Sequence, residues 1–213
     1  MIEAEPANFS PIDGAEARIE LVDWYGKPAI RKARMPKPYR IELLDRTIRS
    51  RRTKEEVEIL HACKLAGVDC PQVHFADPIS SEIIMEYIQG TVLKDFRGDT
   101  ENVLRQVGSK TARLHLNRII HGDLTTKNMI ISGERVAFID FGLSFFSDRI
   151  EDRAEDLHLL KQALKSSEST RKANSQFEEA MNGYLDIAGK KDTAAVKKQI
   201  AKIELRGRYA QVD

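Results

Sequence analysis

The 213-residue sequence predicts a small α+β fold with two lobes, a β-rich N-terminal lobe with one main helix and a reduced helical C-terminal lobe. Three observations predict this class. Segments with strand-like composition lie before residue 88. Apolar residues at helical spacing dominate after Gly90, and one hairpin, residues 128–140, interrupts them. We place the lobes at residues 1–87 and 88–213, as parts of one bilobal domain with a ligand cleft between them.

The N-terminal lobe is predicted to contain two hairpins and one helix. Helical spacing runs from Thr53 to Gly67, a residue type that commonly ends helices, and the helix could begin earlier within LLDRTIRSRR. The residues DWYGKP and the pair Asp77-Pro78 supply the turns of the two hairpins. The predicted strands are RIELV (18–22), AIRKAR (29–34), QVHFA (72–76) and EIIMEYI (82–88).

The C-terminal lobe is predicted to be mainly helical. Apolar residues recur there at three- and four-residue steps, which indicates helices with one buried face. These residues are Val103, Leu104, Val107, Thr111 and Leu114, then Leu157, Leu160 and Leu164, and then Phe177, Met181, Tyr184, Val196, Ile200 and Ile203.

Composition limits the partners and the compartment. Lys and Arg number 34 against 33 Asp and Glu, so no global field requires nucleic acid or an anionic membrane, and such a partner must use a local patch. No apolar run approaches the roughly 20 residues of a membrane helix. The start MIEAEPANFS lacks the features of a signal peptide. We therefore expect a cytoplasmic protein in which Cys63 and Cys70 are free thiols.

The strongest functional signal is HGDLTTKN (121–128), followed by a hairpin that ends in IDFG (139–142). The order H-x-D-x-x-x-x-N, hairpin, D-F-G after a β-rich lobe is typical of phosphoryl transfer from ATP. A turn near Gly133 would place Asn128 and Asp140 opposite each other at the open end of the hairpin. These oxygen ligands suit Mg²⁺. Asp123 is the predicted catalytic residue, which orients the attacking hydroxyl or water.

These motifs resemble those of the protein-kinase-like superfamily, and the resemblance covers most of the chain. It implies that Lys32 holds the α- and β-phosphates of ATP and that Glu56 is its ion-pair partner on the helix. A second interpretation stays open, because Thr53-Lys-Glu-Glu56 also matches a capping box, in which Glu56 would bond the backbone of Thr53. We favour the ion pair, because the helix could begin earlier.

The resemblance also implies contacts to the nucleotide. Met85 occupies the gatekeeper position, and the segment from Glu86 to Ile88 is expected to bond the adenine through backbone groups. No G-x-G-x-x-G precedes the first hairpin strand, so backbone N–H groups around Gly14 and Ala15 would cover the phosphates.

Three further residues are given supporting roles by the resemblance. His121 is expected to brace the catalytic loop, and Thr125 stands where most protein kinases place a lysine. Asp156 resembles the helix aspartate that bonds the backbone of the catalytic loop. The alternative for Asp156 is a solvated position on an amphipathic helix.

Departures from ordinary protein kinases narrow the resemblance. HGD replaces HRD, and no A-P-E or long activation segment follows DFG. With KPYRIELLDRTIRSRRTKEE before the helix, the chain resembles the Bud32 family, the Rio-like kinase and ATPase subunits of the KEOPS (EKC) complex. Proline is expected in this family where Glu42 stands. The matching residues are GAEA (14–17), Lys32, Arg34, Lys37, Tyr39, Arg40, Asp45, Arg52, Thr53, Glu56, HGDLTTKN, IDFGLS (139–144) and EDRAEDL (151–157).

This resemblance implies an atypical serine/threonine kinase and Mg-dependent ATPase that uses ATP and supports threonylcarbamoyl-adenosine formation in tRNA. It implies a Kae-one-type threonylcarbamoyltransferase on the C-terminal lobe and a small Cgi-type subunit on the N-terminal lobe. Two other functions stay open: a small-molecule phosphotransferase of the aminoglycoside type, and a nucleotide-binding scaffold without turnover. The short helical C-terminal part argues against the former, and the intact set of motif residues argues against the latter.

A local excess of positive charge predicts contact with RNA. Residues 31–54 contain ten Lys or Arg and only two acidic residues, Glu42 and Asp45. Such an excess attracts phosphates. Arg46, Arg49 and Arg51 are the candidate tRNA contacts, and the alternative is a solvated helix face.

Overall fold

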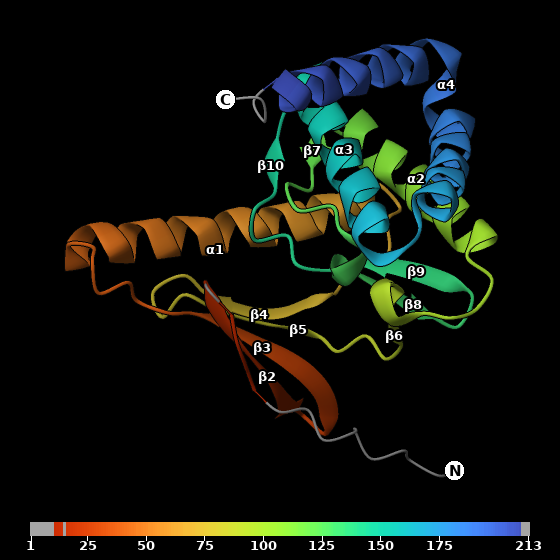
Figure 1. Ribbon diagram of the computed structural model, residues 1–213. Helices are drawn as coiled ribbons and strands as arrows, with labels where there is room; N and C mark the ends of the chain where they lie inside the picture. The colour runs from red at the N-terminus through yellow and green to blue at the C-terminus, as the bar shows by residue number, and fades with distance from the viewer. Residues whose placement is uncertain (1–10, 15, 210–213) are drawn as a thin grey trace, which may run out of the picture. The chain divides into compact units, whose positions relative to one another are not determined.

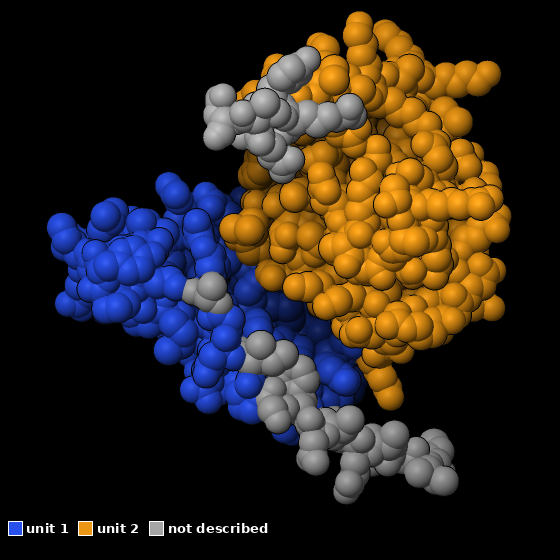
Figure 2. Space-filling view, viewed as in Figure 1, with its two compact units in different colours: residues 1–61, 71–88 blue, residues 62–70, 89–213 orange. Residues whose placement is uncertain are grey.

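The computed structural model describes residues 11–14 and 16–209. The chain divides into two compact units, coloured separately in Figure 2: residues up to His61 with Pro71–Ile88, and Ala62–Cys70 with the residues from Gln89 onward. Residues 62–70 pack with the second unit because Asp69 contacts it. The Asp69 carbonyl accepts a hydrogen bond from Phe138 N at 2.9 Å, and its carboxylate pairs with Lys110 at 2.5 Å.

The first unit is built on an antiparallel sheet with the strand order β1-β2-β3-β5-β4 (Figure 1). The β2–β3 hairpin closes through Tyr25 and Gly26, whose φ angles of 52° and 79° suit the right-handed twist of the strands. The four predicted strands are confirmed, with ends that move by one or two residues. The strands are β1 (Ile12–Asp13), β2 (Ala17–Trp24), β3 (Lys27–Arg34), β4 (Val73–Asp77) and β5 (Glu82–Glu86).

Helix α1 (Glu42–Leu65) begins well before Thr53, where helical spacing first appears in the sequence. The early start depends on the buried carboxylate of Asp45, which accepts hydrogen bonds from Lys37 N at 3.3 Å and Arg49 Nε at 2.6 Å. The Arg49 guanidinium holds the pKa of Asp45 below its usual value. These polar contacts, rather than an apolar stripe, organise the first turns, so helical periodicity does not reveal them.

The second unit combines short strands with long helices (Figure 1). The predicted hairpin is confirmed, and its turn lies at Gly133, with φ 60°. Strands β6, β8 and β9 form one sheet, and β7 pairs with β10. The elements are β6 (Thr91–Val92), η1 (Leu93–Asp95), α2 (Glu101–Leu116), β7 (Ile119–Ile120), η2 (Thr126–Asn128), β8 (Met129–Ser132), β9 (Arg135–Phe138), β10 (Phe145–Phe146), α3 (Ile150–Ser167) and α4 (Thr170–Tyr209).

Two glycines allow α2 and α4 to approach each other closely. A Cβ on Gly108 would lie 1.7 Å from the carbonyl oxygen of Ala180, and one on Gly183 would lie 1.9 Å from that of Arg105. Only glycine fits such backbone contacts. The close crossing brings the buried Tyr184 of α4 against α2.

Helix α4 is interrupted at Gly189, whose φ and ψ of 79° and 169° are not helical. The residues on either side carry the apolar faces that the sequence predicts, ending with Tyr184 before the break and starting with Val196 after it. Within residues 11–14 and 16–209, no helix is both long enough and apolar enough to cross a membrane.

Candidate active site

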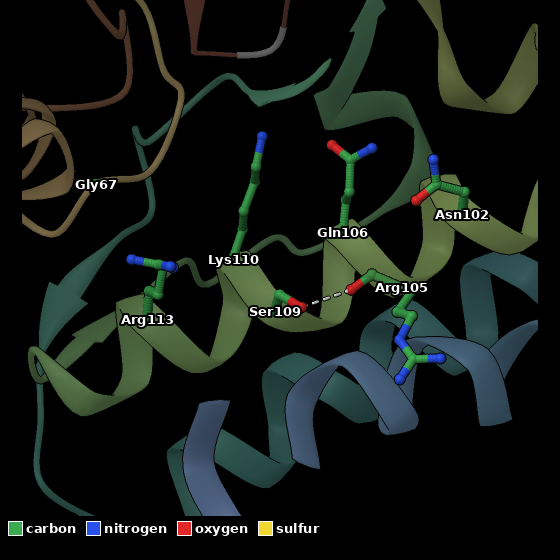
Figure 3. A pocket seen from close by; sticks show the side chains of 7 residues that line it. All are labelled: Gly67, Asn102, Arg105, Gln106, Ser109, Lys110 and Arg113. Atoms are coloured by element: carbon green, nitrogen blue, oxygen red, sulfur yellow. Dashed lines mark hydrogen bonds between the residues drawn. The ribbon is translucent and has the colours of Figure 1, made fainter. Parts of the chain in front are cut away.

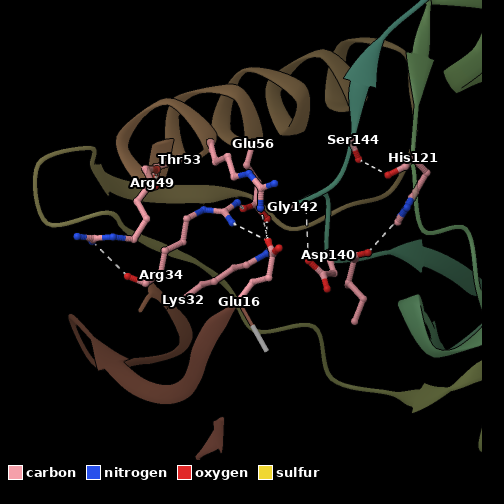
Figure 4. Close-up of polar contacts among 12 residues, drawn as sticks. Glu16, Lys32, Arg34, Arg49, Thr53, Glu56, His121, Asp140, Gly142 and Ser144 are labelled. Atoms are coloured by element: carbon pink, nitrogen blue, oxygen red, sulfur yellow. Dashed lines mark hydrogen bonds and ion pairs between the residues drawn. The ribbon is translucent and has the colours of Figure 1, made fainter. Parts of the chain in front are cut away.

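One carboxylate in the first unit binds two cationic side chains (Figure 4). Lys32 Nζ donates to Glu56 Oε1 at 2.6 Å, and Arg34 Nη2 donates to Glu56 Oε2 at 2.6 Å. All three side chains are buried. Residues two apart on a strand point to the same face, so Lys32 and Arg34 both reach Glu56 on α1. The predicted Lys32–Glu56 ion pair is confirmed, whereas the role of Arg34 in holding Glu56 was not predicted.

The capping-box interpretation of Glu56 is wrong. Because α1 begins at Glu42, Thr53 lies in the helix interior, where its backbone N–H is not one of the unpaired N-terminal donors. Thr53 Oγ1 donates instead to the carbonyl oxygen of Arg49 at 2.9 Å, one turn earlier. Glu56 is therefore available for the two cations.

Glu16 completes this charged cluster. Its carboxylate lies 3.9 Å from Arg34 Nη1 and pairs with Arg52. Arg34 Nε is buried and has no hydrogen-bond partner among the described residues. A buried N–H of a guanidinium suits an anionic ligand such as a phosphate.

Gly14 lies in the turn between β1 and β2. Its N–H donates to the carbonyl oxygen of Ala17 at 3.0 Å, so this donor is already engaged. Ala15 lies outside the described residues. Phosphate binding by Gly14 and Ala15 stays a prediction, and at Gly14 it requires that the turn bond open.

The segment predicted to bind adenine begins at the last residue of β5. Met85 is buried, at 7% exposure, and Glu86 and Ile88 are half-buried. The N–H of Glu86 donates to the carbonyl oxygen of Gln72 at 2.8 Å. The Glu86 carboxylate accepts a hydrogen bond from Gln72 N at 3.0 Å. Both the N–H and the side chain of Glu86 therefore bond Gln72, the residue before β4.

The predicted catalytic loop folds tightly around Asp123 in the second unit. Asn128 Nδ2 donates to the Asp123 carbonyl oxygen at 2.9 Å and to its carboxylate at 2.8 Å. Thr125 N–H donates to Asp123 O at 2.8 Å, and Asn128 N–H to Thr125 O at 3.0 Å. Asp123 is only half-buried and lines a cavity of about 510 Å³ together with Lys94 and Lys127. A small group can therefore reach its carboxylate.

The end of the β8–β9 hairpin holds the second carboxylate. Ile139 N–H donates to Asn128 O at 3.0 Å, so Asn128 and Asp140 lie at the same end. Asp140 is exposed and has φ 59°, a value uncommon outside glycine and often found at functional sites. Because Asn128 Nδ2 is directed at Asp123, its Oδ1 is the atom available to a ligand. An amide oxygen and a carboxylate fit Mg²⁺, which typically takes one or two protein ligands.

Asp156 on α3 anchors the catalytic loop. Its Oδ2 accepts from His121 N at 2.7 Å, and its Oδ1 accepts from Gly122 N at 2.8 Å. A third donor, His115 Nε2, lies 3.2 Å from Oδ2. Asp156 is 1% exposed, so the predicted anchoring role is confirmed and the solvated-face alternative is wrong.

His121 braces the loop against the hairpin, as predicted. Its Nε2 lies 3.2 Å from the carbonyl oxygen of Ile139, and its ring packs 4.7 Å from that of Phe141. A carbonyl only accepts, so Nε2 carries the proton. Burial lowers the pKa of His121 and outweighs the opposing effect of Asp156 and the other nearby carboxylates. The ring is therefore neutral at pH 7.

The structure explains why the second residue of the HGD motif is glycine. Gly122 has φ 79°, and a Cβ there would lie 2.3 Å from the carbonyl oxygen of Leu143. A larger residue would both strain the backbone and push Leu143 away.

His115 is a site residue that the sequence analysis missed. No sequence spacing connects it to Asp156, so only the structure reveals their contact.

The three candidate RNA contacts on α1 differ in their surroundings. Arg49 is directed inward, to Asp45 and to the carbonyl oxygen of Arg34 at 3.4 Å. Arg46 is exposed, and Arg51 is exposed beside Glu55 at 3.5 Å. The structure thus gives Arg49 an internal role, and only Arg46 and Arg51 remain accessible to RNA.

A separate cavity of about 400 Å³ lies along α2 (Figure 3). Gln106, Lys110 and Arg113 line it, and Lys110 Nζ pairs with Asp69. None of the predicted site residues lines this cavity.

The β-rich first unit with its Lys–Glu pair, and the helical second unit with its HGD loop and DFG, define a protein-kinase-like protein. Residues 31–158 match the RIO domain family. Among solved structures, the Rio2 kinase from Chaetomium thermophilum has a TM-score of 0.65 at 15% identity, over 93% of this chain and 72% of that one. WaaP in complex with acyl carrier protein has a TM-score of 0.62 at 15% identity, over 94% and 87%. These likenesses show the fold.

Closer relatives define the family within this class. The KEOPS complex subunit Bud32 of Pyrococcus abyssi is 41% identical over 93% of this chain and 94% of its own. The probable serine/threonine-protein kinase BUD32 homolog of Archaeoglobus fulgidus is 39% identical over 93% and 95%. The chain belongs to the Bud32 family of RIO-domain kinases.

Another group of relatives is longer. The probable bifunctional tRNA threonylcarbamoyladenosine biosynthesis protein of Methanothermobacter thermautotrophicus is 43% identical over 92% of this chain. This chain spans only 36% of the length of that protein.

We expect Gly122→Ala to lower the free energy of unfolding by more than about 2 kcal/mol, since backbone strain of roughly 1–3 kcal/mol adds to the clash with Leu143. Gly133→Ala is the matched control, because Gly133 also has positive φ but no atom within 4 Å of a new Cβ. Urea unfolding of both variants measures the difference. Equal losses would show that the Leu143 contact is unimportant.

We also expect stability to depend on the protonation of His121. Its folded pKa lies below the unfolded value of about 6.5, so stability is complete above that pH and falls as the pH decreases toward the folded pKa. Melting temperatures at about pH 7.5 and 5.5 measure this loss. His121→Gln should reduce the difference, whereas His61→Gln, at an exposed histidine, should not. A full difference in His121→Gln would refute the assignment.

Proposed function

We propose that the chain is the ATP-hydrolysing subunit of a KEOPS-type tRNA-modification complex and an atypical serine/threonine kinase. The observation that carries the proposal is the presence of both sets of ATP-handling groups in formed contacts. The first unit has the Lys32–Glu56 pair, and the second has Asp123 bonded to Asn128 beside Asp140. A scaffold without turnover has no need of the second set.

The charged cluster of the first unit is proposed to bind the phosphates of ATP. Lys32 and Arg34 are held in place by Glu56, so they lose little freedom when an anion binds. Adenine would contact the segment from Glu86 to Ile88 beside Met85. Because Glu86 N–H is bonded to Gln72, Glu86 would use its carbonyl oxygen.

The groups of the second unit are proposed to act on the transferred phosphate. Asn128 and Asp140 would hold Mg²⁺, which neutralises charge on the phosphate oxygens when bound. Asn128 Nδ2 fixes one oxygen of the Asp123 carboxylate, so the other can orient a hydroxyl or water and accept its proton. Asp156 and His121 keep this loop in position.

The partners are proposed from the family. The relatives named as a KEOPS complex subunit and as bifunctional threonylcarbamoyladenosine biosynthesis proteins support a role in this tRNA modification. A threonylcarbamoyltransferase of the Kae-one type would bind the second unit, and a small Cgi-type subunit the first. In the bifunctional relatives, the matched region is joined to a longer chain, which supports a partner that works beside it. The assembly would act in the cytoplasm.

The first experiment measures phosphate release from Mg·ATP by the chain alone and with the threonylcarbamoyltransferase and tRNA. We expect release to rise with both additions. Lys32→Met should lower release roughly a hundredfold, because it removes a fixed charge from the phosphates. Lys27→Met is its matched control, since Lys27 is an exposed lysine on the same strand. Asp140→Ala supplies the blank.

Different outcomes separate the candidate functions. Phosphate release that does not change when the partner and tRNA are added would point to a free-standing kinase. A screen for phosphorylated proteins and small molecules would follow. The absence of any release above the Asp140→Ala blank would contradict the ATPase proposal and leave a scaffold.

We expect tRNA binding by the assembled complex to weaken about tenfold in the double variant Arg46→Glu, Arg51→Glu, with a smaller salt dependence, because phosphate contacts are lost. The matched control is Lys190→Glu with Lys191→Glu, two exposed lysines on α4 in the second unit. Filter binding at several salt concentrations provides the measurement. Unchanged affinity in the arginine variant would exclude contact through α1.

A further inference from the structure

We propose that Tyr184 is a positioning residue for the catalytic loop, although it belongs to α4 and touches no predicted substrate group. Its hydroxyl would fix the ring of His115, which holds the Asp156 carboxylate that binds the backbone of His121 and Gly122. The inference rests on the proposed function in one respect, that the loop from His121 to Asn128 is the catalytic one.

The contacts form a continuous path within the second unit. Tyr184 Oη lies 3.1 Å from His115 Nδ1, and His115 Nε2 lies 3.2 Å from Asp156 Oδ2. The same carboxylate accepts from His121 N at 2.7 Å and from Gly122 N at 2.8 Å. Two side-chain contacts therefore separate Tyr184 from the Asp156 carboxylate that binds this backbone.

The direction of each hydrogen bond follows from the groups involved. An ionised carboxylate only accepts, so His115 Nε2 must carry the hydrogen that faces Asp156. In a neutral imidazole, Nδ1 is then an acceptor, and the Tyr184 hydroxyl must donate to it. Burial raises the pKa of Tyr184, so its hydroxyl keeps its proton. Asp156 thus fixes the tautomer of His115, and the Tyr184 hydroxyl fixes the orientation in which Nε2–H faces Asp156.

Burial makes the hydrogen bond of Tyr184 matter. His115 is 0% exposed, and Tyr184 and Asp156 are each 1% exposed, so water cannot replace a lost partner. Without the hydroxyl, the buried Nδ1 has no donor, and the His115 ring loses the contact that holds it opposite Asp156. The hydrogen bond from Nε2 to Asp156 then weakens. A buried polar group without its partner costs far more than an exposed one.

The packing of α4 explains how Tyr184 keeps its position. It directly follows Gly183, one of the two glycines at the close crossing of α2 and α4. Its ring meets the His115 ring at a centroid distance of 5.6 Å and an angle of 63°. The hydroxyl is therefore placed by the helix crossing, and the α2–α4 contact becomes part of the support of the catalytic loop.

The test uses the full chain and the variant Tyr184→Phe, which removes the hydroxyl and keeps the ring. Nitrogen NMR of the histidine rings reports hydrogen bonding at Nδ1 and Nε2 of His115, and backbone NMR reports the amides of His121 and Gly122. We expect the wild-type ring to carry its hydrogen on Nε2. In the variant, we expect a shifted Nε2–H signal of His115, shifted amide signals and faster hydrogen exchange at both amides.

Tyr184→Phe should change kcat but not the KM for ATP. Loss of one buried hydrogen bond predicts a kcat for phosphate release that is roughly three- to tenfold lower. The KM for ATP should stay unchanged, because the lysine and arginine that would bind its phosphates lie in the first unit.

The matched control is Thr111→Val, which removes an equally buried hydroxyl from α2. Thr111 Oγ1 donates to the carbonyl oxygen of Val107, at 2.8 Å, and takes no part in the hydrogen bonds that lead from Tyr184 to Asp156. This variant should lose stability but keep the Nε2–H signal of His115 and kcat. Equal changes of this signal and of kcat in both variants would indicate a general packing effect and overturn the proposal.

The outcomes also separate this inference from the proposed function. If the wild-type chain releases no phosphate, the ATPase proposal fails, but the NMR signals of His115, His121 and Gly122 still decide the role of Tyr184. A variant with an unchanged Nε2–H signal of His115 and unmoved amides would overturn the inference, whatever its activity.

Discussion

The position of the predicted catalytic loop depends on one buried carboxylate, that of Asp156. A carboxylate in the protein interior is stable only when hydrogen-bond donors surround it, since an unpaired buried charge costs several kcal/mol. Here the donors are the N–H groups of His121 and Gly122 and the imidazole of His115. Because two of them belong to the backbone of the loop, satisfying the charge also fixes the chain direction that leads to Asp123.

A second buried carboxylate, that of Glu56, lies in the first unit and is stabilised in a different way. It is surrounded by cations rather than by neutral donors, and its two oxygens bind Lys32 and Arg34. Asp156 thus supports a fixed backbone, whereas Glu56 holds two cationic side chains in place. The two units supply different requirements of phosphoryl transfer, position and charge.

Three glycines make close backbone contacts possible in the second unit. Gly122 is required where the loop passes within contact of Leu143, and Gly108 and Gly183 are required where α2 meets α4. Each allows two backbone segments to approach more closely than any side chain permits. The loop that carries the predicted catalytic residue Asp123 is held by one of these contacts, at Gly122.

The sequence by itself determined the class of fold and the order of the main strands and helices, because local periodicity encodes these features. Its resemblance to a known family also led to the Lys32–Glu56 pair and the anchoring role of Asp156, and its motif spacing predicts Asp123, Asn128 and Asp140 as site residues. Tertiary structure alone decided the start of α1, the inward direction of Arg49 and the contacts of Arg34 and His115. Each of these depends on a buried polar group, such as Asp45, Glu56 or Asp156, that must find partners distant in the chain. Such pairing is set by three-dimensional packing, and no short-range pattern of residues records it.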